Sequence, residues 1–254
     1  MRIFGSLFGK PKPKYELLGN IAPICPYCSR ALDKMPSRKK KCPHCGNYIY
    51  VRTRPSDNRR VLVTEEDAVK IDEQWMIEHG TYDAYLAEKR EFEIQKAELA
   101  KKWGREPSDS DVHWAIYNKQ LLEHARKGDW GLYRNTRFNM AEQLRHEKKD
   151  RPALETYLEV SYIDANGPRN MGGIFDPEIV RKYPPFSRDS AFQAPAIVHY
   201  IQELSASLGM KEDDLKKAFL EVAERTRNNL RLLPVSPEQA WNELWKALHK
   251  NKGR

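Results

Sequence analysis

All four cysteines of the chain fall in two Cys-x-x-Cys pairs, Cys25 with Cys28 and Cys42 with Cys45. A Cys-x-x-Cys turn directs both thiolates at one point, and a second turn nearby completes a tetrahedron of sulfur ligands. Such a set suits zinc and, less often, iron. We therefore expect these four cysteines to hold one structural Zn²⁺. A site closed by four sulfurs leaves no open position at which a metal could activate water.

A redox or iron site and a set of unliganded thiols are the alternatives for the same four cysteines. His44 lies between Pro43 and Cys45. We expect it to be a bystander, because sulfur already completes the ligand set.

The residues that follow the second pair alternate as in a β-strand. Ile49, Val51 and Thr53 should share one face, and Tyr48, Tyr50, Arg52 and Arg54 the other. A turn over residues 55–58 precedes a second short strand over residues 59–63. Two cysteine turns that lead into strands resemble the zinc-ribbon superfamily over residues 21–63. The resemblance implies a metal-bearing ribbon and no particular activity.

Positive charge is concentrated at the cysteine-bearing end. Residues 1–60 hold 14 Lys and Arg but three acids, whereas the whole chain has a net charge of +8. Cations can follow phosphates and aromatic rings can stack on bases. We therefore expect a nucleic-acid surface made by Arg38, Lys39, Lys40, Lys41, Tyr48, Tyr50, Arg52, Arg54, Arg59 and Arg60. The alternatives are a solvated loop with two core tyrosines, or a surface that meets an anionic protein.

Composition points to a cytoplasmic protein. Hydrophobic residues make up 40% and charged residues 31% of the chain, as in helix-rich soluble proteins. No apolar run is long enough to span a bilayer, and the apolar stretch over residues 1–8 is too short for a secretory signal. In a reducing compartment, paired cysteines hold metal more often than they form disulfides.

After Thr64 the pattern becomes helical. Apolar residues recur at helical spacing, with caps at Thr64, Ser108 and Ser236. The expected fold is an α protein with a small β module, in which an N-terminal zinc ribbon precedes an all-α domain of antiparallel helical hairpins. The expected parts are a flexible basic leader (1–20), the ribbon (21–63), a helical hairpin domain (64–165), a long Gly/Pro-rich loop (166–190) and C-terminal helices (191–254).

One hairpin in this domain resembles a tetratricopeptide unit. Its second helix carries Ala153, Tyr157, Val160 and Ala165 at that repeat's spacing, and Ala141 and Leu144 fit its first helix. The sequence shows no second copy at a matching period, whereas an array needs about three. The chain as a whole also resembles uncharacterised zinc-ribbon proteins of bacteria and phages.

These patterns predict a non-catalytic zinc-binding protein. The ribbon would contact nucleic acid, and the helical domain would dock a protein partner. A protein–protein adaptor or structural component without a nucleic-acid role is the alternative. A metal-dependent nuclease that uses Asp164, Asp176, Glu178 and Lys182 is a weaker one. The sequence predicts no oligomeric state.

Overall fold

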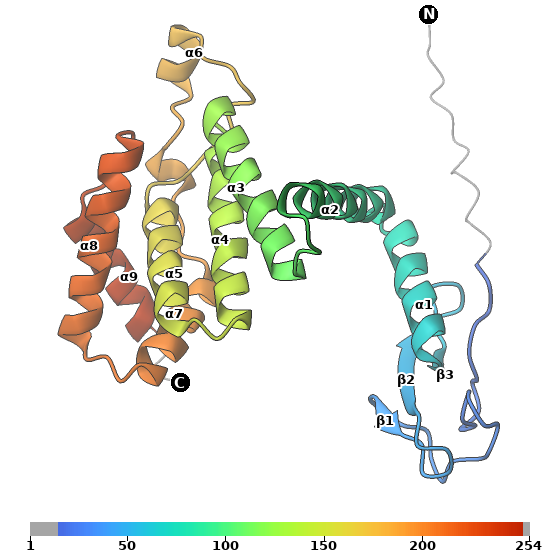
Figure 1. Ribbon diagram of the computed structural model, residues 1–254. Coiled ribbons are helices and arrows are strands. Elements are labelled where there is room, and N and C mark those ends of the chain that lie inside the picture. Colours follow the sequence, from blue (N-terminus) through green and yellow to red (C-terminus); the bar gives the residue numbers. More distant parts are fainter. Residues whose placement is uncertain (1–14, 251–254) are drawn as a thin grey trace, which may run out of the picture. The chain divides into compact units, whose positions relative to one another are not determined.

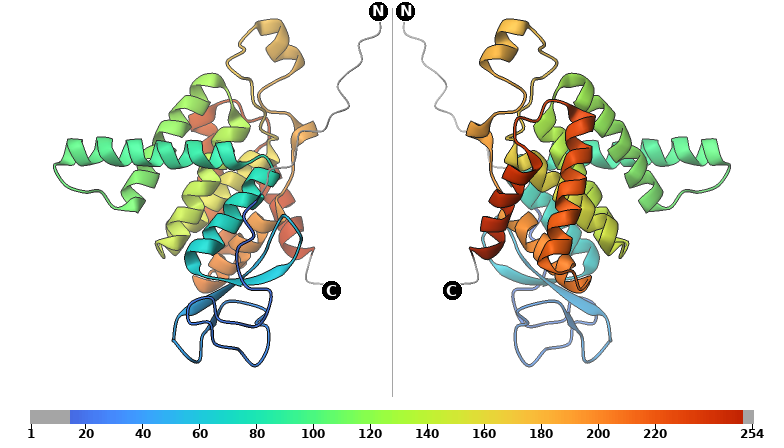
Figure 2. Two further views of the ribbon diagram at one scale, coloured as in Figure 1. Left: turned by 90° about the vertical axis from the view of Figure 1, so that its right-hand side faces the viewer. Right: turned by 90° about the vertical axis from the view of Figure 1, so that its left-hand side faces the viewer.

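The computed structural model describes residues 15–250, so most of the leader expected over residues 1–20 lies outside the described part. The described chain is mostly helical, with one small antiparallel sheet close to the cysteines (Figure 1, Figure 2). The fold class expected from the sequence is therefore confirmed. A boundary after Glu91 divides the chain into two compact units, and this boundary falls within a helix.

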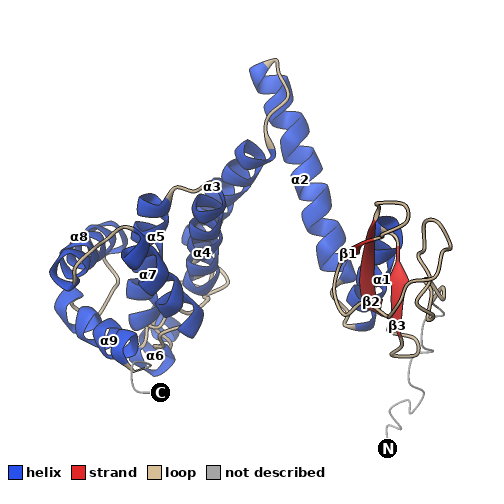
Figure 3. Cartoon of the chain, turned by 90° about the horizontal axis from the view of Figure 1, so that it is seen from below, coloured by secondary structure: helices blue, strands red, loops and turns tan. Residues whose placement is uncertain are grey.

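The first unit contains every strand of residues 15–250 (Figure 3). Strands β1 (Lys40–Lys41), β2 (Tyr48–Thr53) and β3 (Arg60–Val63) form an antiparallel sheet in the order β1-β2-β3. Lys41 pairs with Tyr48, and Thr53 pairs with Arg60. The two pairings therefore lie at opposite ends of β2.

Both faces of this sheet are covered. Ile49 and Leu62 pack on one face against Cys25 and Cys42. Val61 and Val63 pack on the other face, where α1 (Glu65–Glu78) supplies Ala68 and Ile71. Successive strand residues point to opposite faces, so one short strand can serve both cores.

Polar contacts fix α1 on the sheet. The Thr64 hydroxyl accepts a hydrogen bond from the Asp67 N–H at 3.1 Å and caps the helix. Arg52 donates two hydrogen bonds to Asp72, at 2.8 and 3.1 Å. The Trp75 indole N–H donates to the Thr53 carbonyl at 2.7 Å. Helix α1 is therefore part of the cysteine-bearing unit.

The second unit is built from helices. Helix α2 (Tyr82–Trp103) contains the boundary between the units. It is followed by α3 (Asp109–Lys127), α4 (Trp130–His146), α5 (Asp150–Ala165), α6 (Pro177–Lys182), the 3₁₀ helix η1 (Arg188–Ser190), α7 (Pro195–Ser207), α8 (Glu212–Leu230) and α9 (Pro237–His249).

Helix α5 is the centre of this unit. It packs against α4, α7, α8 and α9, and every residue from Thr156 to Ala165 is buried. Two of these residues are acids, and α4 supplies an arginine for each. Arg134 donates to both carboxylate oxygens of Asp164 at 2.6 Å, and Arg137 forms the corresponding pair with Glu159. Removing one partner would leave a buried charge uncompensated, which is costly.

Residues 167–187, which we call the arm, leave this helical core after α5 and return before η1. At its root, the Arg169 N–H donates to the Pro185 carbonyl and the Ser187 N–H donates to the Gly167 carbonyl, each at 2.9 Å. The arm carries α6 at its far end, beyond the other helices of the unit (Figure 2).

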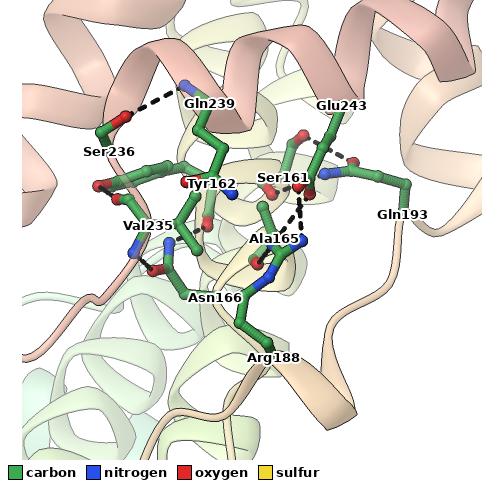
Figure 4. A network of polar contacts seen from close by, with 10 residues as sticks. All are labelled: Ser161, Tyr162, Ala165, Asn166, Arg188, Gln193, Val235, Ser236, Gln239 and Glu243. Atoms are coloured by element: carbon green, nitrogen blue, oxygen red, sulfur yellow. Dashed lines mark hydrogen bonds and ion pairs between the residues drawn. The ribbon is translucent and has the colours of Figure 1, made fainter.

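A polar network fastens the C-terminal end of α5 to the segments that follow the arm (Figure 4). Arg188 donates to the Ala165 carbonyl at 2.7 Å and forms an ion pair with Glu243 of α9 at 2.6 Å. The Asn166 side chain accepts from the Val235 N–H, and the Tyr162 hydroxyl donates to the Val235 carbonyl. The root of the arm is thus part of the packed core.

Gly167 offers a test of this root. Its φ is +64°, and a Cβ there would overlap the Ser187 carbonyl oxygen and lie 2.8 Å from the Ala191 nitrogen. We predict that Gly167→Ala lowers the free energy of unfolding by about 2 to 5 kcal/mol, from left-handed strain and overpacking together.

Gly172→Ala is the matched control, because Gly172 has a φ of +59° but open space around its Cβ position. It should cost about 1 to 2 kcal/mol, from the backbone conformation alone. Urea unfolding followed by far-UV circular dichroism measures both. Equal losses for the two variants would contradict the close approach at Gly167.

Candidate metal centre

The sulfur atoms of Cys25, Cys28, Cys42 and Cys45 converge, all lying within 4.8 Å of one another. Cys25 Sγ lies 3.8 Å from Cys45 Sγ, and Cys28 Sγ lies 3.9 Å from Cys42 Sγ. A tetrahedral ion with metal–sulfur bonds of about 2.3 Å has its ligands about 3.8 Å apart. A disulfide needs about 2.05 Å. The four thiols are therefore free and are placed to hold one metal ion.

The two turns that carry these sulfurs have the same backbone pattern. In each, the first cysteine's carbonyl accepts from the N–H four residues later: Ser29 to Cys25 and Gly46 to Cys42, both at 3.0 Å. In each, the first cysteine's N–H donates to the carbonyl five residues later, that of Arg30 or Asn47. The site is thus built from two equivalent knuckles.

The residue four positions after the first cysteine has a left-handed backbone conformation in both knuckles. Gly46 has a φ of +76° and Ser29 has a φ of +57°. Glycine adopts this left-handed conformation freely, whereas serine does so at a cost of about 1 to 2 kcal/mol. Ser29 was not singled out from the sequence. Superimposing the two Cys-x-x-Cys segments would have revealed it, because both residues stand four positions after a first cysteine.

The thiols differ in how readily they ionise. Burial raises the pKa of Cys25 to about 11, although the N–H groups of Cys28 and Tyr27 partly oppose this. Burial also disfavours the Cys42 thiolate, but hydrogen bonds from the N–H groups of Cys45 and His44 and from the Cys25 and Cys45 side chains together outweigh it and lower the pKa of Cys42 to about 6. A metal ion needs all four sulfurs as thiolates, so its binding releases protons and weakens as the pH falls.

Side chains around the sulfurs link the knuckles to the rest of the unit. His44 Nε2 lies 3.0 Å from the Ala31 carbonyl oxygen, which bridges the second knuckle to the first. Tyr27, between the cysteines of the first knuckle, accepts a hydrogen bond from the Glu65 N–H at 3.0 Å. Glu65 begins α1. The position of the helix is therefore coupled to the geometry of the metal centre.

The ten residues of the expected nucleic-acid surface divide into three groups by their exposure and their position on the sheet. Arg38, Lys39, Lys40, Lys41 and Tyr48 are exposed together at the β1 end of the sheet, and the Tyr48 side chain is 52% exposed. Arg59 and Arg60 are also exposed, at the opposite end of β2. The remaining three, Tyr50, Arg52 and Arg54, are wholly or partly buried.

These three side chains have structural partners. Arg54 is only 4% exposed; it pairs with Asp57 and donates to the Leu18 carbonyl. Arg52 pairs with Asp72, as described above. Tyr50 donates its hydroxyl proton to Glu65 and accepts a hydrogen bond from Lys39 at 2.7 Å. The alternating pattern placed these side chains on one face, but it could not show that α1 covers that face.

Lys39 lies over two tyrosine rings. Its ammonium group is 4.3 Å from the centre of the Tyr50 ring and 4.8 Å from that of Tyr48. Both contacts are cation–π interactions. The hydrogen bond to Tyr50 also raises the pKa of Lys39. Lys39 is therefore tethered to the sheet, whereas the exposed Arg38, Lys40 and Lys41 form no ion pair with any residue of the described range 15–250.

The four residues of the nuclease alternative are not brought together as a metal site. The Asp164 carboxylate is taken by Arg134, and burial raises its pKa. Asp176 caps α6 by accepting from the N–H groups of Glu178 and Ile179. The Lys182 ammonium lies over the Tyr183 ring. Within residues 15–250, the cysteines are the only group of His, Cys, Asp or Glu side chains placed to hold a metal.

Comparison with known protein families, curated proteins and solved structures finds no match to this chain. Among residues 15–250, no helix has the length and apolar character that crossing a membrane requires.

We predict that Cys25→Ser abolishes stoichiometric metal binding and unfolds the cysteine-bearing unit. Cys25 is fully buried, and a structural four-cysteine metal contributes about 10 to 16 kcal/mol in small modules. His44→Ala, which changes a neighbouring side chain but no sulfur, is the control and should retain the metal. Elemental analysis gives the metal content, and hydrogen exchange locates the unfolding.

The loss of exchange protection should be confined to residues 15–91, because α5 and its neighbours form a separate core. Retention of one metal per chain by Cys25→Ser would contradict the four-sulfur site. So would full protection of β2 and β3 after removal of the metal by a chelator.

Proposed function

We propose that the first unit is a zinc ribbon that binds single-stranded nucleic acid, and that the helical unit docks a protein partner. The observation that carries the proposal is the group of exposed residues at the β1 end of the sheet, where Arg38, Lys39, Lys40 and Lys41 lie near the exposed Tyr48 and the Lys39 ammonium lies 4.8 Å from the centre of the Tyr48 ring. In this account neither unit is catalytic, and the metal holds the binding surface in shape.

Zinc is the metal that best suits four thiolates in tetrahedral geometry. The separations of 3.8 and 3.9 Å between sulfur atoms match the edge of such a tetrahedron. Ile49 of β2 and Leu62 of β3 pack against Cys25 and Cys42. Zinc would therefore fix the strand that carries Tyr48.

Single-stranded nucleic acid is favoured over a duplex by the kind of side chain exposed. An exposed aromatic ring can stack on an unpaired base, and this contact is worth about 1 to 3 kcal/mol per base. Lys40 and Lys41 lie on the edge strand, with both side chains exposed. Arg60 pairs with Thr53, about 17 Å along β2 from Tyr48 at a rise of about 3.3 Å per residue, and Arg59 precedes it. These two arginines add exposed positive charge at that end of the strand.

We predict that Lys40→Gln/Lys41→Gln weakens binding to a single-stranded oligonucleotide and reduces its salt dependence. Each phosphate contact contributes about 0.7 to the slope of log K against log salt for single strands, so the slope should fall by about 1.4. Lys216→Gln/Lys217→Gln, which removes two exposed lysines from α8, is the control of equal charge and should leave the slope unchanged.

Tyr48→Ala tests stacking separately from charge. It should weaken single-strand binding by about 5- to 150-fold, whereas Tyr48→Phe, which keeps the ring, should bind as the wild type does. Fluorescence anisotropy measures both variants, with a duplex of the same sequence for comparison. Undetectable or salt-independent binding would contradict the proposal. An unchanged affinity of Tyr48→Ala would contradict the stacking role.

A further inference from the structure

The arm of the helical unit exposes a group of large apolar side chains. Ile174, Phe175, Ile179 and Tyr183 are 49%, 61%, 42% and 52% exposed. Ile179 and Tyr183 lie one helical turn apart, and the Tyr183 N–H donates to the Ile179 carbonyl at 2.7 Å. Scattered apolar residues are normal on a surface, whereas four large exposed ones within ten consecutive residues make the arm a candidate interaction site.

These side chains are presented on a well-fixed backbone. The Gly172 N–H donates to the Asp129 carboxylate at 2.6 Å, and the Gly173 N–H donates to the Lys127 carbonyl at 2.8 Å. The Phe175 ring lies against Gly128, where an added Cβ would come within 3.3 Å of it. A surface that is already ordered loses less conformational entropy when a partner binds.

Two cations lie beside the apolar group. Arg181 and Lys182 are exposed, and neither forms an ion pair with any residue of the described range 15–250. Asp176, the N-cap residue of α6, is committed to capping the helix, and Glu178, the one acid within α6, is exposed. The surface thus combines apolar anchors with two cations that form no ion pair within residues 15–250, and the Lys182 ammonium lies over the Tyr183 ring.

We propose that the arm is the docking site for an acidic peptide segment of a partner protein, one that carries apolar side chains flanked by carboxylates. This inference rests on the proposed docking role of the helical unit and assigns that role to a surface. Ile174, Phe175, Ile179 and Tyr183 supply the apolar contact. Arg181 and Lys182 pair with the partner's carboxylates, which gives the interaction its charge preference.

An anionic membrane fits this surface less well. Asp176 and Glu178 lie next to Phe175 and Ile179, so insertion of these apolar residues would bring two carboxylates to the negative headgroups. Arg181 and Lys182 would add only about 1 kcal/mol each. A protein segment can avoid the acids, whereas a uniform anionic surface cannot.

The test uses the full chain and three short fluorescent peptides. The first carries Leu and Glu in a mixed sequence, the second has Lys in place of each Glu, and the third has Ser in place of each Leu. The first should bind about tenfold or more tightly than either of the others. Phe175→Ser and Ile179→Ser should each weaken its binding about tenfold, within the usual range for buried anchors.

Ile94→Ser is the control, because Ile94 of α2 is as exposed as Phe175 but lies outside the arm. It should bind the first peptide as the wild type does. Arg181→Gln/Lys182→Gln should reduce the preference for the Glu peptide over the Lys peptide. All these positions are exposed, so thermal melting should show that the variants remain folded.

Equal binding of the three peptides, or no effect of Phe175→Ser, would overturn the proposal. Binding to anionic vesicles or self-association, if either were lost in Phe175→Ser, would assign the arm to a membrane or to a second copy of the chain. A partner protein, once identified, could be tested for binding to the wild type and to Phe175→Ser. Equal binding would support the docking role of the helical unit but would rule out the arm as the docking site. The oligonucleotide assay is independent of all these outcomes.

Discussion

Four sulfur atoms have to meet at one point, and the first unit depends on this requirement. Each knuckle uses the same two backbone hydrogen bonds and a left-handed residue, Ser29 or Gly46, to bring its cysteines into position. Ile49 and Leu62 then pack directly on Cys25 and Cys42. Tyr27 carries the constraint to α1 through the Glu65 N–H. The strand that bears Tyr48 thus packs, through Ile49 on its opposite face, against the four-cysteine site.

A different constraint organises the helical unit. Helix α5 is buried at every residue from Thr156 to Ala165, and this stretch includes the acids Glu159 and Asp164. Arg134 and Arg137 lie three residues apart on α4 and pair with Asp164 and Glu159, which lie five residues apart on the antiparallel α5. A slide of one helix along the other would separate both pairs, so the charges specify the register of the α4–α5 hairpin. The arm leaves from the C-terminal end of this helix, where backbone hydrogen bonds between residues 167–169 and 185–187 close its root.

The sequence was informative where local pattern determines the result. The Cys-x-x-Cys spacing predicted the convergence of the sulfurs, and the alternation after Gly46 predicted β2. The caps at Thr64, Ser108 and Ser236 marked helix starts that the structure contains. Local pattern could not reveal partners distant in sequence. Nothing near Arg52 or Tyr50 identifies Asp72 or Glu65 as their partner, and α6 within the arm lacked a recognisable periodic signal.

X-ray absorption at the zinc edge of the purified full chain tests whether the four cysteines hold zinc. We predict one zinc per chain, bound by four sulfur neighbours at about 2.3 Å and by no nitrogen or oxygen. Mutation of His44 should leave this spectrum unchanged. A nitrogen or oxygen ligand, fewer than four sulfurs, or protein that binds no thiophilic metal would contradict it.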